Sequence, residues 1–175
     1  MTQNINRIFI IAGTLIMMFV MMSTGKTLKT KATPLGIINL ELAWNSSRAD
    51  HVISAWSVPA PGNIDNIKVA IQNTWLDFIF LFFYSLFLFY LCLSISESSK
   101  GIIRVTGKLM AMAALNAGML DIFENAGMLF TLNNFSSNGI ALFTAVCSAL
   151  KWFLVLCSIL YILLAGPWVL LRKDK

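Results

Sequence analysis

Two carboxylates and an amide lie about one helical turn apart inside an apolar stretch from Leu109 to Leu132. Asp121, Glu124 and Asn125 follow an i, i+3, i+4 spacing, so they share one face of a helix. A charged Asp near the centre of a membrane span costs about 2.5–3.5 kcal/mol on the insertion scale. These side chains must therefore face a polar interior, hold a proton or lie beside a cation. Ionisable residues placed in this way predict a functional site.

Other polar residues of neighbouring apolar segments fall at matching depths. With a rise of 1.5 Å per residue, Tyr84, Asp121 and Lys151 are predicted to lie roughly 14–17 Å from the same membrane face. Asp77 and Glu124 share a shallower level, and Asp77 and Tyr84 are seven residues apart on one helix face. We expect a direct or water-bridged contact between Lys151 and Asp121. If these two form an isolated pair, Asp121→Asn should be more damaging than Lys151→Met.

The chemistry of this set stays open at the level of sequence. The carboxylates could bind a proton, a small cationic ligand or a lipid headgroup, or an ion pair could simply fix helix packing. They could also act as acid and base in a membrane enzyme, although an enzyme is the less favoured interpretation. No cofactor is predicted, but a divalent cation could bind to carboxylate oxygens, which would come from Glu41, Asp77, Asp121 and Glu124. The full set of candidate site residues is Glu41, Asp77, Tyr84, Asp121, Glu124, Asn125 and Lys151.

The composition is that of a membrane protein. Of 175 residues, 58% are hydrophobic and only 12% are charged, and the mean hydropathy is +0.76. A soluble domain carries about twice this charged fraction. The net charge of +5 comes from basic residues near the ends of apolar segments, which is typical of membrane topology rather than of a nucleic-acid surface. We therefore exclude nucleic acid and expect the lipid bilayer as the main partner.

The apolar segments predict an all-α, four-helix transmembrane bundle that forms one domain over residues 1–175. Each segment is near the length of about 20 residues that a bilayer requires. The first segment is either a retained span or a cleaved signal peptide. A helix opened by Pro34 and another capped by Ser46 or Ser47 should form an extracytoplasmic cap over residues 33–57. The four predicted spans cover residues 8–22, 74–95, 109–132 and 140–164.

The basic residues also predict the orientation of the bundle. The connection between the second and third spans carries Lys100, Arg104 and Lys108, whereas the connection over residues 133–139 carries no basic residue. The positive-inside tendency then places both termini in the cytoplasm. We expect the membrane to be the inner membrane of the cell. Three lysines within residues 26–31 oppose this assignment, because they would lie on the other side.

Three segments resemble a group of small bacterial four-span membrane proteins. The resemblance implies a four-helix membrane fold and no activity. The residues that it singles out are Glu41, Asp77, Asp121, Glu124 and Asn125. Where we would expect Gly-Thr after the first segment, this chain has Trp44-Asn45. The segments are Thr33-Pro34-Leu35-Gly36-Ile37 with Glu41-Leu42-Ala43, Leu76-Asp77-Phe78 with Tyr84, and Asp121-Ile122-Phe123-Glu124-Asn125.

The sequence therefore favours an integral membrane protein with an acidic intramembrane pocket that binds a small ligand, a lipid or a proton. The alternative is an accessory or structural subunit of a larger membrane complex. The protein could also form a homo-oligomer. A membrane-embedded acid–base or metal-dependent enzyme is the third interpretation.

Overall fold

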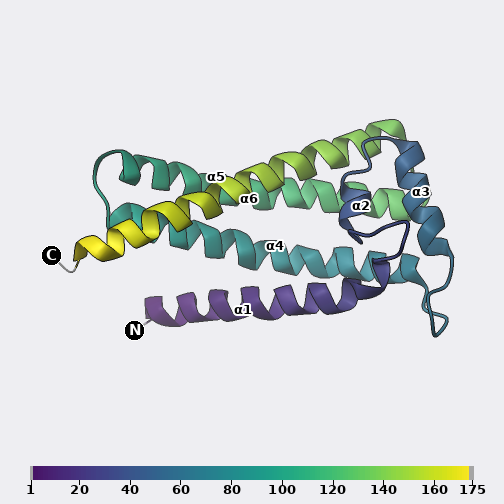
Figure 1. The fold of residues 1–175 in the computed structure, drawn as a ribbon, viewed down its shortest axis with the longest axis horizontal. Helices are drawn as coiled ribbons and strands as arrows, with labels where there is room; N and C mark the ends of the chain where they lie inside the picture. Colours follow the sequence, from purple (N-terminus) through teal and green to yellow (C-terminus); the bar gives the residue numbers. More distant parts are fainter. Residues whose placement is uncertain (1, 174–175) are drawn as a thin grey trace.

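Long helices lie side by side, and two short helices cover one end of them (Figure 1). The computed structural model describes the backbone of residues 2–173 and the side chains of residues 7–169. The prediction of an all-α fold is confirmed for this part of the chain, where only an isolated bridge joins Ala60 and Ile64. The elements are α1 (Thr2–Thr24), the 3-10 helix η1 (Gly25–Leu28), α2 (Ile38–Glu41), α3 (Ser46–Ser57), α4 (Asn66–Glu97), α5 (Gly101–Leu132) and α6 (Asn138–Lys173).

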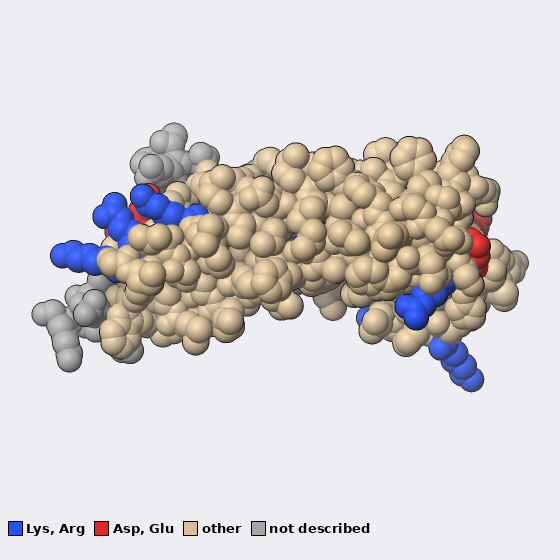
Figure 2. Space-filling model, turned by 90° about the horizontal axis from the view of Figure 1, so that it is seen from above, with Lys and Arg blue, Asp and Glu red and all other residues tan. Residues whose placement is uncertain are grey.

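Three of the long helical segments are long and apolar enough to cross a membrane, which makes this a multi-pass membrane protein. They are Arg7–Leu28, Asn66–Glu97 and Asn138–Val169. At 1.5 Å per residue, the 32 residues of α4 extend about 48 Å, well beyond the roughly 30 Å hydrocarbon layer. On the face seen in Figure 2, the charged side chains gather at the two ends of the molecule. The predicted third span, α5, is also 32 residues long, but it is not among the three.

Several element boundaries differ from the predicted ones. α5 begins eight residues before the predicted start, so Arg104 and Lys108 belong to this helix and not to the connection before it. α6 continues through Pro167 to Lys173, beyond the predicted end at residue 164. Pro34 does not open a helix, since residues 34–37 form a turn and α2 begins only at Ile38.

Side-chain caps explain where two helices start. The prediction that Ser46 or Ser47 caps α3 is wrong, because Asn45 has the extended backbone of a cap and its side chain accepts a hydrogen bond from the Arg48 amide. At α4, the Asp65 side chain accepts a hydrogen bond from the Lys68 amide at 3.1 Å. This bond stabilises the charged carboxylate and lowers the pKa of Asp65.

Small residues allow the long helices to pack closely. α5 lies against both α4 and α6, while α1 packs on α4. Buried Ala114, Ala117 and Gly118 line α5, and a β-carbon added at Gly118 would lie only 2.9 Å from Cβ of Ser85 on α4. Such small-residue contacts let membrane helices approach each other without large side chains between them.

The cap is anchored to one end of the bundle by an apolar cluster and by hydrogen bonds. Trp56 of α3 is buried in this cluster together with Leu28 and Met128. Its indole Nε1 donates to the Leu28 carbonyl at 3.0 Å and to Thr33 Oγ1 at 3.1 Å. These contacts hold the first connection, and with it Glu41 of α2, over the ends of α5 and α6.

Candidate functional site: a carboxylate cluster around Lys151

Lys151 of α6 forms ion pairs with two carboxylates of α5. Its Nζ donates hydrogen bonds to Asp121 Oδ1 and Glu124 Oε1, each at 2.9 Å. Glu124 Oε2 also lies 2.8 Å from the ammonium nitrogen, although it accepts no hydrogen bond of good geometry. All three side chains are buried. The predicted contact between Lys151 and Asp121 is therefore confirmed, and Glu124 shares it.

Glu41 brings a third carboxylate to the same ammonium group from the cap. Glu41 Oε2 lies 3.8 Å from Lys151 Nζ. The same oxygen accepts hydrogen bonds from Ser148 Oγ and Trp152 Nε1, both at 3.3 Å. Glu41, the last residue of α2, thus contacts Lys151, Ser148 and Trp152 of α6. We name the Lys151 cluster as Lys151, Glu41, Asp121 and Glu124.

Two side chains of α4 extend the polar contacts across the bundle. The Tyr84 hydroxyl donates to Asp121 Oδ2 at 2.7 Å, so both oxygens of Asp121 have partners. Asn125 Nδ2 donates to Asp77 Oδ2 at 2.8 Å. Asp77 and Tyr84 lie on α4 at a spacing of two turns, which lets both reach the polar face of α5.

All seven candidate residues lie in this region of contacts between α2, α4, α5 and α6. The predicted depth levels agree with the contacts, because Tyr84, Asp121 and Lys151 meet at one level and Asp77 meets the residue next to Glu124. Trp152 was not predicted as a partner of Glu41. Its position directly after Lys151 on an otherwise apolar helix was the available signal. The ring of Trp152 also lies 5.4 Å from Lys151 Nζ, within range of a cation–π contact.

Some buried oxygen atoms near the cluster have no hydrogen-bond partner in the described chain. They are Glu124 Oε2, Asn125 Oδ1 and Thr144 Oγ1. Thr144 of α6 lies against Gly127 of α5. Gly127 is about one helical turn from Glu124 on α5. Buried polar atoms in native proteins are usually paired with protein or with ordered water. Such groups offer hydrogen-bonding positions for water beside the carboxylates.

The arrangement does not favour a divalent-metal site. Among the described residues, no group of three or more His, Cys, Asp or Glu side chains is arranged to hold a metal ion. The Lys151 ammonium itself lies between the oxygens of Glu41, Asp121 and Glu124. A cation bound by the same three oxygens would have to displace it. The cluster is thus a buried set of ionisable side chains joined by ionic hydrogen bonds. No family model, curated protein or solved structure matches the chain.

Proposed function

We propose that this chain is a bacterial inner-membrane protein whose Lys151 cluster binds and releases protons. The observation that supports the proposal is the ratio of charges: three carboxylates face one ammonium group in a buried site. If all three were ionised, two negative charges would remain uncompensated. A buried charge without a partner costs several kcal/mol. Protons on the carboxyl groups remove this cost, so the number of bound protons is the property that the cluster can vary.

Proton exchange also requires neighbours that can pass a proton on. The Tyr84 hydroxyl is bonded to Asp121, and the Thr144 hydroxyl and the Asn125 carbonyl oxygen are buried without protein partners. Water held at these groups would connect Glu124 to the cap end of the bundle. Chains of hydrogen-bonded acids and hydroxyls are the usual proton relays of membrane proteins.

The proposal includes α5 as a fourth span. α5 has the same length as α4 and packs against α4 and α6, both of which are candidate spans. Its acidic residues are buried, while large apolar side chains cover its outer surface, among them Leu109, Met112, Met119, Ile122 and Phe130. Polar residues that face the bundle interior are compatible with a membrane-spanning helix. Four spans would then place both termini in the cytoplasm and the cap outside.

The backbone at Trp44 supports the proposed relation to the group of small four-span proteins. Trp44 has a φ of 56°, in the left-handed region that glycine adopts most easily. Asn45, which follows it, caps α3. Gly-Thr at these two positions would supply the preferred residue for a left-handed backbone and another good helix cap. Trp44 and Asn45 thus take the left-handed backbone conformation and the helix-capping role that Gly-Thr would fill at these positions.

Infrared spectroscopy of the purified protein in lipid tests the proposal. We expect an absorption band of protonated carboxyl groups that is sensitive to deuterium exchange, changes with pH and is weakened by Glu124→Gln. Asp65→Asn is the matched control, because Asp65 is exposed at a helix cap and its lowered pKa keeps it ionised near neutral pH. If Glu124→Gln does not fold, Glu41→Gln takes its place.

Two results would contradict the proposal. A spectrum without protonated carboxyl groups at any pH at which the protein is folded would mean that the cluster holds no proton. A band whose intensity does not vary with pH would mean that the protons are fixed parts of the structure.

The second candidate function is that of an accessory subunit in a membrane complex. The direct ion pairs of Lys151 with both Asp121 and Glu124 favour it, because they join α5 to α6 as a structural contact would. Purification in a mild detergent separates the two proposals. Stable recovery with a larger complex supports the subunit, whereas a separate protein with a titrating carboxyl band supports proton binding.

A further inference from the structure

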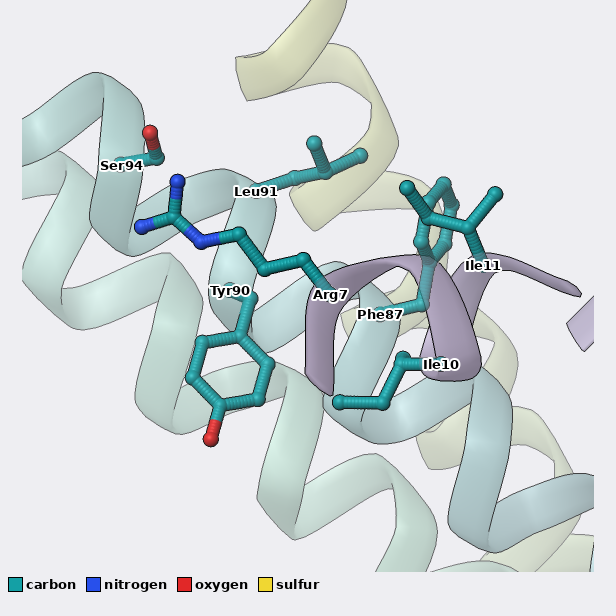
Figure 3. A pocket seen from close by; sticks show the side chains of 7 residues that line it. All are labelled: Arg7, Ile10, Ile11, Phe87, Tyr90, Leu91 and Ser94. Carbon is teal, nitrogen blue, oxygen red and sulfur yellow. The ribbon is translucent and has the colours of Figure 1, made fainter. Parts of the chain in front are cut away.

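A groove between α1 and α4 lies at the end of the bundle opposite the cap. Its walls are formed by Ile10 and Ile11 of α1 and by Phe87 and Leu91 of α4. The groove is shallow, with a volume of about 80 Å³, and is open on its outer side. In Figure 3, these apolar side chains lie along the contact between the two helices. Because both helices are candidate membrane spans, the open side of the groove faces the lipid.

The groove has one polar end, which is formed by Arg7 and Ser94. Arg7 extends from α1 across α4, and its guanidinium group lies near the turn that carries Ser94 (Figure 3). Arg7 is exposed and has no hydrogen bond or ion pair with any residue in the described part of the chain. Ser94 is seven residues from Phe87, which is roughly 10 Å along the helix axis. The Arg7 guanidinium group thus lies at one end of an apolar groove that is roughly 10 Å long.

The basic residues at this end of the bundle favour an anionic occupant. Lys100 precedes α5 directly, and Arg104 lies in its first turn. Both are close in sequence to the end of α4, whose last residue is the acidic Glu97. Basic residues next to a membrane surface attract the headgroups of anionic lipids. The planar guanidinium group of Arg can also bind two phosphate oxygens at once.

We propose that this groove binds one anionic phospholipid, with its phosphate at Arg7 and one acyl chain against Ile10, Ile11, Phe87 and Leu91. The apolar walls accommodate the chain, and the free guanidinium group selects the headgroup. The site is separate from the Lys151 cluster and does not depend on the proposed proton chemistry. The lipid would hold α1 against α4 at the end where no cap covers the bundle.

Native mass spectrometry of the detergent-purified protein tests the proposal by counting bound lipids. The probes are phosphatidylglycerol and phosphatidylcholine with identical acyl chains. We expect preferential binding of phosphatidylglycerol, weakened roughly fivefold by Arg7→Gln, the effect of one basic residue at a membrane surface. Lys31→Gln is the control, because Lys31 is an exposed basic residue at the cap end of the chain, and it should leave the preference unchanged.

Several outcomes would overturn the proposal. The preference for phosphatidylglycerol could be unchanged in Arg7→Gln, or could fall equally in Lys31→Gln. Either result would mean that only nonspecific attraction between charges holds the lipid. Inorganic phosphate could also displace the bound lipid as effectively as added phosphatidylglycerol does. That result would show an anion site to which the apolar groove contributes nothing. If Arg7→Gln does not insert into the membrane, Arg7→Lys keeps the charge and removes the planar pair of donors. Unchanged phosphatidylglycerol binding by that variant would also contradict the proposal.

Discussion

Lys151 shares its charge between side chains from two different parts of the chain. Asp121 and Glu124 bind it from α5, and Glu41 approaches it from the cap. Loss of either α5 carboxylate leaves the ammonium group with another partner. Loss of Lys151 leaves three buried carboxylates without their cation. The energetic consequence of a substitution therefore depends on which side of the cluster is changed.

We expect Lys151→Met to destabilise the protein by roughly 3–5 kcal/mol, as the breaking of buried ion pairs does. Asp121→Asn should cost about 1–3 kcal/mol, the loss of one buried hydrogen-bonded group. This order reverses the one expected for an isolated pair, because Glu124 remains beside Lys151. The double replacement should cost less than the sum of the two single ones. Unfolding in mixed detergent micelles measures the three differences.

Lys68→Met is the control for this comparison, since Lys68 is 79% exposed in its pair with Asp65. It should leave the stability unchanged. Strict additivity of the Lys151 and Asp121 replacements would contradict an energetic coupling between them. A larger loss in Asp121→Asn than in Lys151→Met would mean that Glu124 does not act as a second partner.

At the scale of elements, the position of α5 depends on glycines that leave room for its neighbours. Gly127 faces Thr144 of α6 so closely that an added β-carbon would overlap the threonine hydroxyl. A β-carbon added at Gly118 would likewise lie too close to the side chain of Ser85 on α4. These contacts set the distance between helices and thereby bring Lys151 within reach of both α5 carboxylates.

Gly127→Ala should destabilise the bundle by about 1–3 kcal/mol, because overpacking forces neighbouring side chains or helices to move. The matched control is Gly139→Ala on α6, where an added β-carbon would meet only Ser137 Oγ at 3.9 Å. That change should be neutral or stabilising, since Ala favours a helix over Gly by up to about 1 kcal/mol. Thermal unfolding of both variants compares them directly. Equal effects would mean that the contact of Gly127 with Thr144 does not limit the packing.

Across the whole molecule, the charged side chains on the face seen in Figure 2 mark two ends separated by a long stretch without them. Many large apolar side chains are exposed on the long helices between these ends. The cap and the connection between α5 and α6 lie at one end, where Ser46 donates to Asn138. The connection between α4 and α5 lies at the other end. A membrane across the apolar surface must therefore separate these two groups of residues.

Cysteines introduced at Ser47 and Ser98 test this orientation with a reagent that does not cross the membrane. We expect the cysteine at position 47 to react from outside the cell and the cysteine at position 98 to react only after the membrane is opened. The control is the parent chain, whose Cys92, Cys147 and Cys157 lie within α4 and α6. Labelling of position 98 in intact cells would contradict a cytoplasmic connection between α4 and α5.

The amino-acid sequence is enough to predict a membrane protein and most of the residues in the Lys151 cluster. Long apolar segments predict helices in a membrane, because the chain must satisfy its own backbone hydrogen bonds there. Ionisable residues in such segments are conspicuous, and helical rise alone places Tyr84, Asp121 and Lys151 at one depth. For this reason the Lys151–Asp121 contact could be predicted without a structure.

The contribution of the first connection to the cluster depends instead on contacts between distant parts of the chain. Glu41 lies 107 residues before Ser148, to which it is hydrogen-bonded, and helical periodicity fixes no relation over such a distance. The position of Glu41 follows from the cap, in which Asn45 caps the start of α3 and Trp56 is buried against Leu28. The path of a long connection depends on these nonlocal contacts, whereas the depth of a residue in a membrane helix depends only on its local rise.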